Sequence, residues 1–300
     1  MKPYCWEQTF AQALALADLV TAVRALYDVG AGDKRRHPRP REIRHALALL
    51  QEHVPDPEHR WSWAARLIEE RLSTALGVKL VITLFLDRSD DVVALWLRLA
   101  EHPDWERREA AVWMLSQLLV HHFDDIYIRC LQWVHHPSQN VRRAVAVGVK
   151  IAAKARVPDW GERFLDLIEP LLQDQSVYVR KNLGPFAVGD GLLRCYPELT
   201  LKRLAAWAQR PDQQTRWNVA MAFSAAEGAK HLQTAMPILA QLAADERRFV
   251  WRAVASAMRN LGRRRSTEVV PILEAWVRDE RRRQVAEVAL RHIDQGTGKA

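Results

Sequence analysis

The sequence predicts an all-α fold, an α-solenoid of paired helices behind a helical N-terminal cap. Apolar residues recur with a helical period along the 300 residues, and no stretch alternates as a half-buried strand does. Glycine is scarce, at 12 residues. A unit of about 36 residues also repeats along the last two thirds of the chain, and each unit contains two helical patterns joined by a polar turn.

The repeats align on one position near the start of each second helix. The aligned segments are "HPDWERREAAVWML", "HPSQNVRRAVAVGV", "DQSVYVRKNLGPFA", "RPDQQTRWNVAMAF" and "ADERRFVWRAVASAM". The shared position holds Arg107, Arg142, Arg180, Arg216 and Trp251, at spacings of 35, 38, 36 and 35 residues, and a degenerate sixth copy is "RDERRRQVAEVALRHI". Because one helix pair cannot bury its apolar face alone, stacked pairs share a continuous core, as in HEAT-type solenoids.

These patterns divide the chain into three parts. We expect residues 1–100 to form the helical cap, with a basic loop at 30–42. Residues 101–293 form the HEAT-like array, whose second helices line the inner curve. Residues 294–300, "DQGTGKA", are expected to form a frayed tail.

The composition favours a polyanionic partner inside the cell. The chain has 44 Lys and Arg against 36 Asp and Glu, a net charge of +8. Cys5, Cys130 and Cys195 are far apart, which suggests buried thiols in a reducing compartment. No signal peptide and no apolar run of roughly 18 residues is found, so we expect a cytoplasmic protein without a membrane partner.

Two further patterns are interpreted as structural. Trp133, Trp207 and Trp276 recur at one position on the apolar face of the first helices, and we expect them in the core. The pairs His121–His122 and His135–His136 do not suit a metal, because adjacent residues on a helix face different directions. No metal and no organic cofactor is expected.

A carboxylate lies between two tryptophans on one helix. Trp105, Glu109 and Trp113 follow one another at i, i+4 steps, with Ser116 beside them. They fall outside the apolar arc of that helix, which is centred on Ala110, Met114, Leu115 and Leu118. Glu109 is either a surface carboxylate paired with an arginine or a functional group held among aromatic walls.

Basic residues come in pairs at the starts of the second helices. The first residue of each pair suits a ladder of Asp–Arg contacts between repeats. The second residue, as in Arg108, Arg143 and Lys181, points elsewhere on its helix. A succession of such cations would line a groove and match the phosphates of a duplex.

The same residues carry a family resemblance. "DWERRE", "WVHHPSQNVRRAV" and "SVYVRKNLGPFAVGDGLLRCYPEL" resemble bacterial DNA alkylation repair glycosylases of the AlkD and AlkC type, over residues 90–200 and more loosely to about 290. The resemblance implies a hydrolase that excises N3- and N7-alkylated purines. It matches Trp105 and Glu109 to a Trp–Asp pair, and Arg143 to a groove arginine. A second tryptophan of the family falls at Pro185 or Phe186.

The AlkC branch implies another register, in which Trp160 and Asp190 match site residues. In either register a carboxylate would stabilise positive charge on the sugar as the glycosidic bond breaks. The first register assigns catalysis to Glu109, with Trp105 and Trp113 near the sugar and Arg143 on a phosphate. We expect a monomer acting on duplex DNA that contains alkylated bases. A non-catalytic DNA-binding solenoid and a protein-interaction scaffold are the alternatives.

Overall fold

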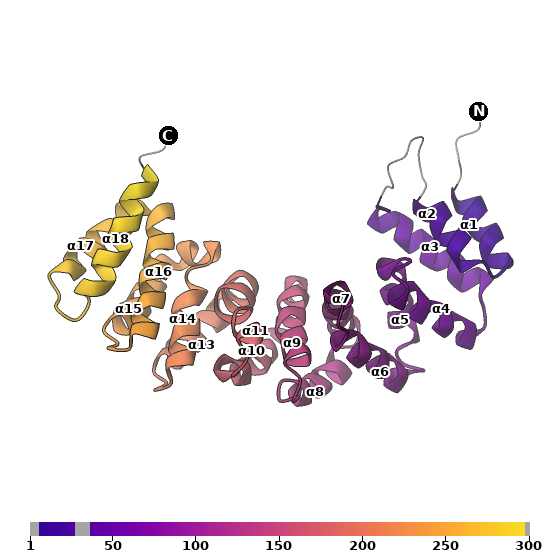
Figure 1. Ribbon diagram of the computed structural model, residues 1–300, viewed down its shortest axis with the longest axis horizontal. Helices are drawn as coiled ribbons and strands as arrows, with labels where there is room; N and C mark the ends of the chain where they lie inside the picture. The colour runs from indigo at the N-terminus through magenta and orange to yellow at the C-terminus, as the bar shows by residue number, and fades with distance from the viewer. Residues whose placement is uncertain (1–5, 28–36, 298–300) are drawn as a thin grey trace. The chain divides into compact units, whose positions relative to one another are not determined.

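The chain is helical throughout its described part and divides into two compact units. The computed structural model describes residues 6–27 and 37–297, and every regular element within them is a helix, which confirms the all-α, solenoid class (Figure 1). Unit 1 is Met1–His121 and unit 2 is His122–Ala300. The division falls one helix beyond the end of the expected cap, since α7 (Trp105–His121), the second helix of the first repeat, belongs to unit 1.

Unit 1 is built from antiparallel neighbours. Its helices are α1 (Trp6–Ala15), α2 (Leu19–Tyr27), α3 (Pro40–His53), α4 (Pro57–Glu69), α5 (Thr74–Leu84), α6 (Ser89–Ala100) and α7 (Trp105–His121). Helix α1 packs on α2 and α3, α4 packs on α5, and α6 packs on α7. Of the expected basic loop, 30–36 lies outside the described residues, and α3 already begins within its last part.

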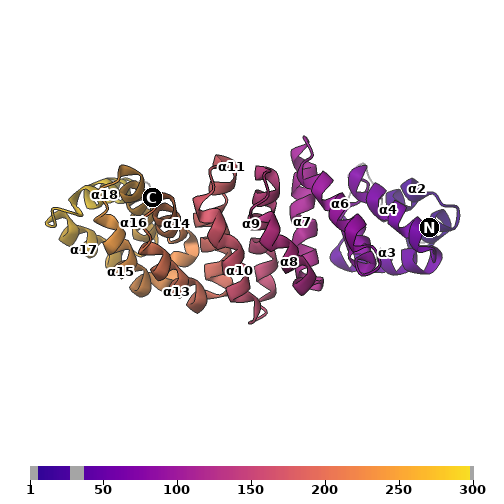
Figure 2. The same ribbon diagram turned by 90° about the horizontal axis from the view of Figure 1, so that it is seen from below.

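Unit 2 consists of successive pairs of a first and a second helix (Figure 2). The first helices are α8 (Phe123–Trp133), α10 (Trp160–Ile168), α13 (Pro197–Ala208), α15 (Leu232–Ala243) and α17 (Ser266–Val277). The second helices are α9 (Gln139–Ala152), a composite helix, α14 (Gln213–Ala222), α16 (Arg248–Arg264) and α18 (Arg283–Thr297). The composite helix joins α11 (Val177–Arg180), the π-helix η3 (Leu183–Leu192) and α12 (Leu193–Cys195). Since α18 runs to Thr297, the expected tail begins inside a helix, and 298–300 lies outside the described residues.

Helices of one kind stack on the next of the same kind in unit 2. Helix α9 packs on η3, η3 on α14, α14 on α16 and α16 on α18, while α10 packs on α13 and α13 on α15. The second helices lie on the inner side of the curve that unit 2 makes in Figure 1. The side chains between the two layers form one continuous apolar core, as expected of a solenoid.

Most of the residues that the sequence pattern placed in the core are buried, including Ala110, Met114, Leu115 and Leu118. Trp133, Trp207 and Trp276 are buried, which confirms their assignment. Ser116 is fully buried and donates a hydrogen bond to the Trp113 carbonyl, so its expected place outside the core was wrong. Burial of the cysteines is confirmed for Cys130 but not for Cys195, which is half-buried; Cys5 lies outside the described residues.

The π-helix lies close against the next second helix. A Cβ atom on Gly189 would lie 2.3 Å from the Ala222 carbonyl oxygen, a distance that real Cβ atoms do not show. One turn earlier, the Gly184 amide donates to the Asn218 side chain, and Asn218 in turn donates to the Leu172 carbonyl. The close approach of η3 to α14 therefore requires glycine, and a buried amide holds it in place.

Candidate nucleic-acid interface

Each second helix begins with the same turn. Its first residue, here called the turn residue, is His102, His136, Asp174, Arg210, Asp245 or Asp279. In five of these six turns, an oxygen or Nδ1 of that side chain accepts the amide N–H two residues later, at 2.7 to 3.1 Å. The N-cap side chains Ser138, Ser176 and Asp212 then accept N–H groups of the helix. His136 thus has a structural task at a helix start.

An arginine six residues after the turn residue ties the turn to its helix. The guanidiniums of Arg108, Arg142 and Arg180 each donate to the carbonyl of the turn residue and to the carbonyl that follows it. The predicted alignment placed Arg107 at this position, so it was wrong by one residue in the first repeat. Arg107 instead donates to the Glu69 carbonyl. Arg108 is therefore engaged in its own turn.

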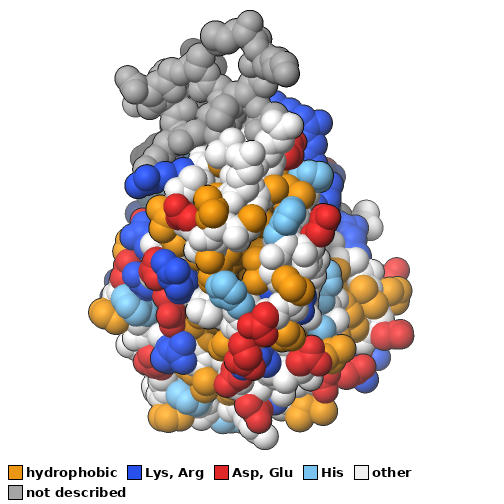
Figure 3. Space-filling view, turned by 90° about the vertical axis from the view of Figure 1, so that its right-hand side faces the viewer, with side chains coloured by type: hydrophobic (Ala, Val, Ile, Leu, Met, Phe, Trp, Pro, Cys, Tyr) orange, Lys and Arg blue, Asp and Glu red, His pale blue; other side chains and the backbone are white. Residues whose placement is uncertain are grey.

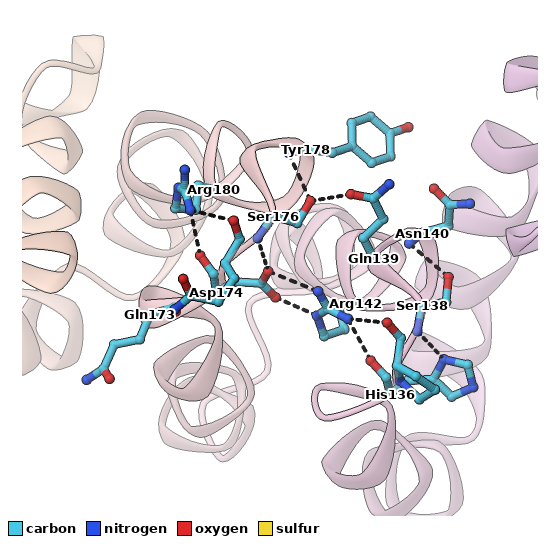
Figure 4. A network of polar contacts seen from close by, with 12 residues as sticks. His136, Ser138, Gln139, Asn140, Arg142, Gln173, Asp174, Ser176, Tyr178 and Arg180 are labelled. Atoms are coloured by element: carbon cyan, nitrogen blue, oxygen red, sulfur yellow. Dashed lines mark hydrogen bonds and ion pairs between the residues drawn. The ribbon is translucent and has the colours of Figure 1, made fainter.

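The expected ladder between repeats is present at two steps. Arg142 forms an ion pair of 2.5 Å with Asp174 (Figure 4), and Arg216 forms one of 2.8 Å with Asp245. Both carboxylates are turn residues of the following repeat, and both are nearly buried, at 4% and 3% exposed. A hydrogen bond from the Arg247 side chain, and a weaker contribution from Arg216, hold the pKa of Asp245 well below its usual range.

A further position recurs in each second helix, seven residues after the turn residue. In the first five repeats these row residues are Glu109, Arg143, Lys181, Trp217 and Arg252, and in the sixth the position holds Ala286. In unit 2, Lys181 and Arg252 are exposed, while Arg143 and Trp217 are half-buried. The row position therefore carries a cation in three of the four second helices from α9 to α16, at the spacing of the repeat.

Aromatic rings lie beside the row, and sequence reasoning missed them. The Arg143 guanidinium lies 5.0 Å from the centre of the Tyr178 ring, and the Lys181 ammonium lies 5.1 Å from the same ring. Two repeats later, Trp217 stacks on Phe249, with ring centres 5.7 Å apart. Tyr178 and Phe249 both stand four residues after their turn residues, but that position holds Asn140 and Gln214 in neighbouring repeats, so the alignment alone does not reveal the rings.

The π-helix adds a second cluster next to this row. The Lys150 ammonium lies 3.2 Å from the centre of the Phe186 ring and 2.9 Å from an oxygen of Asp190. Arg194 forms a further ion pair of 2.5 Å with Asp190. The hydrogen bond from Lys150 lowers the pKa of Asp190, which is therefore an anion shared between two cations.

Two of the predicted site residues lie elsewhere in their unit. Trp160 stacks on Phe123, with ring centres 4.3 Å apart, and also contacts Phe164. These rings belong to the first-helix layer, on α8 and α10. Trp160 therefore packs within a layer on which the row residues do not lie.

The Trp105–Glu109–Trp113 stripe belongs to α7, in unit 1. Trp105 is 63% exposed, while Glu109 and Trp113 are half-buried. All three lie outside the buried face of α7, as the helical wheel predicts. Glu109 is also the row residue of its repeat, so it occupies the same helical position as Arg143 and Lys181 do in unit 2.

Other features of the described residues give less information about what the protein binds. On the face of unit 1 that Figure 3 shows, acidic and basic side chains are interspersed with apolar ones. The described residues contain no group of three or more His, Cys, Asp or Glu side chains that could hold a metal ion. No helix in the described ranges has the length and hydrophobicity of a membrane span.

Comparisons with known proteins give structural likeness alone. No protein-family model matches the sequence, and no curated protein matches it either. An engineered protein of known crystal structure is similar in 67% of this chain and 98% of its own, with 16% identity and a TM-score of 0.32. The karyopherin Kap121p, solved in complex with the extreme C-terminus of the phosphatase Cdc14p, is similar over 96% of this chain, with 14% identity and a TM-score of 0.35. This chain spans 36% of the length of that karyopherin.

Proposed function

We propose that this protein binds duplex DNA along the second helices of unit 2 and excises N3- or N7-alkylated purines from it. The observation that carries the proposal is the succession of row residues, with Arg143, Lys181 and Arg252 at the repeat spacing. Cations repeated along one layer suit the regularly spaced phosphates of a DNA strand. The resemblance of the sequence to alkylation repair glycosylases supports the chemistry.

The rings beside the row help to hold its cations in place. A guanidinium or ammonium over an aromatic face keeps its charge and loses part of its rotational freedom. Arg143 and Lys181 share the Tyr178 ring in this way. Both are therefore oriented before DNA arrives, which reduces the entropy cost of forming the phosphate contacts.

Hydrolysis of the glycosidic bond of an alkylated purine needs only modest stabilisation from the protein. An N7-alkylated purine is a cation, so when its C1′–N9 bond breaks, the bonding electron pair neutralises the departing base. The sugar gains oxocarbenium character, and water then adds at C1′ and loses a proton. In the proposal, the Glu109 carboxylate stabilises the cationic sugar and accepts that proton, while the exposed Trp105 indole packs against the sugar.

Asp190, the other predicted carboxylate, has two cationic partners. Its charge is already shared between Lys150 and Arg194, which lowers its capacity to stabilise a second cation. We assign catalysis to Glu109 because it lies between Trp105 and Trp113 along α7 and matches the family's Trp–Asp pair, and we assign to Asp190 the positioning of Lys150 and Arg194.

Replacing Glu109 with Gln tests this assignment. Excision of 7-methylguanine from a duplex should fall by about 100-fold or more, because the stabilising charge is lost. Affinity for the same duplex should stay within about twofold, since Gln leaves the phosphate contacts in place. Release of the free base, measured by chromatography, gives the rate, and Asp190→Asn is the matched control.

The two variants separate the possible outcomes. Retained excision in Glu109→Gln together with loss in Asp190→Asn would transfer the catalytic role to Asp190. If the wild-type protein binds duplex but releases no base, the function is DNA binding without catalysis. The Lys150 ammonium over the Phe186 ring favours that second candidate, because Phe186 is one of the two positions where the family has its second tryptophan.

A further inference from the structure

A shallow cavity opens beside the stacked rings of Trp217 and Phe249. Its volume is about 550 Å³, and it lies between α14 and α16. The lining residues are Trp217, Met221, Arg248, Phe249, Arg252, Ala253 and Ser256. Its walls are thus aromatic and aliphatic, with two guanidinium groups and no carboxylate.

The two arginines of this cavity are available to a ligand. Arg248 and Arg252 are both exposed. Within the described part of the chain, neither guanidinium forms a hydrogen bond or an ion pair. Most other arginines at the starts of the second helices are committed, as Arg142 and Arg216 are to turn carboxylates. An uncompensated pair of guanidiniums favours an anionic ligand.

The rings also differ from the other aromatic groups beside the row. Tyr178 and Phe186 already have cations over their faces. Trp217 and Phe249 instead contact each other, nearly parallel at 18°, and Phe249 remains 42% exposed. An outer ring face is therefore open, next to two free positive charges. A flat aromatic group attached to phosphate matches this combination.

We propose that this cavity binds an unpaired nucleotide of the bound DNA. The base stacks on the open face of the Trp217–Phe249 pair, and the flanking phosphates contact Arg248 and Arg252. This inference rests on the proposed DNA binding, and it adds that the protein prefers a duplex with an unpaired base to a fully paired one. Stacking on an aromatic side chain needs no particular base, so the preference should not depend on base identity.

Affinities for two duplexes test the inference. One duplex is fully paired, and the other has the same sequence with a single-nucleotide bulge. The wild-type protein should bind the bulged duplex at least about fivefold more tightly, and Trp217→Ala should abolish that preference. Phe249→Leu, which keeps apolar volume but removes the ring, should reduce it. Ile128→Ala is the matched control, since Ile128 is an exposed apolar residue of the first helix α8.

A 2-aminopurine base at the bulge gives a second readout. Its fluorescence should be quenched on binding to the wild-type protein, because stacking on an aromatic ring quenches it, and not on binding to Trp217→Ala. Equal affinity for the two duplexes, or a preference that survives in Trp217→Ala, would overturn the inference while leaving duplex binding intact. Failure of the wild-type protein to bind either duplex would overturn the proposed function as well.

Discussion

At the scale of single residues, the Arg142–Asp174 pair has the largest expected effect on stability. Arg142 donates to two carbonyls of its own turn and to the nearly buried carboxylate of the next repeat. Arg142→Ala would leave that carboxylate without its main partner. We expect a loss of about 3 kcal/mol in the free energy of unfolding, measured by urea denaturation.

Arg163→Ala is the control for this prediction. Arg163 also forms one ion pair of 2.6 Å, with Asp124, but both side chains are well exposed to solvent. An exposed pair contributes only about 0–1 kcal/mol. Equal losses in the two variants would contradict the importance that we give to burial of Asp174.

Asp245 should make stability depend on pH. Its pKa is lowered in the folded protein, chiefly by the side chain of Arg247, so it contributes stability above its unfolded pKa of about 4. That contribution is lost as the pH falls toward the lowered folded value. We expect the melting temperature of Asp245→Asn to lie below that of the wild type at pH 7. The gap should narrow below about pH 4, and a gap constant with pH would show that the charge of Asp245 contributes nothing.

Residue contacts are predictable from the sequence only where the repeat alignment is right. The ladder partners of Arg142 and Arg216 follow from the expected Asp–Arg pattern. Arg108 was misassigned because a one-residue error turns a side chain by about 100° around the helix. The rings of Tyr178 and Phe249 were missed because each contacts the row residue of the preceding repeat, which no local pattern reveals.

At the scale of the elements, the π-helix should depend on Gly189. Gly189→Ala would push a methyl group into the α14 backbone, and we expect a loss of about 2–4 kcal/mol. Gly191→Ala is the matched control within the same π-helix. The added Cβ there would lie 2.8 Å from Cγ of Lys150 and 3.3 Å from its Cα, so it meets no backbone atom as closely as a Cβ on Gly189 does. Chemical denaturation of the two variants should therefore give clearly different stabilities.

The helix pairs were predictable, but the π-helix was not. Apolar periodicity and polar turns fix where α13, α14, α15 and α16 begin and end, within a few residues. The segment 183–192 contains three glycines and a proline, which weaken any helical pattern. Its π-helical geometry depends on contacts with α14 and on the Asn218 amide, which come from another repeat.

At the scale of the whole molecule, the net charge of +8 predicts a salt-dependent affinity for DNA. Each phosphate contact adds about −0.9 to the slope of log K against log salt concentration. Replacing Lys181 and Arg252 together with Gln should therefore make the slope shallower by about two. Titrations of a fully paired duplex at several salt concentrations give this slope. An unchanged slope would show that these row residues do not contact phosphate.

The net charge alone does not show which part of the surface would contact DNA. Many of the arginines serve the fold, because they hold turns, carbonyls and carboxylates in successive repeats. Only the three-dimensional contacts separate these from Arg248 and Arg252. The composition therefore favours a polyanionic partner without locating its site, and the surface that we propose for it rests on the structure.

The recurring turn has a consequence for how repeats can be gained or lost in evolution. Each arginine holds the carbonyls of its own turn, and at two steps it also holds a carboxylate of the next one. Tandem duplication or loss of one complete unit would preserve the arginine–carbonyl contacts within every remaining turn, whereas a partial deletion would separate an arginine from the carbonyls that it holds. Growth and shortening of the array are thereby restricted to whole multiples of its period.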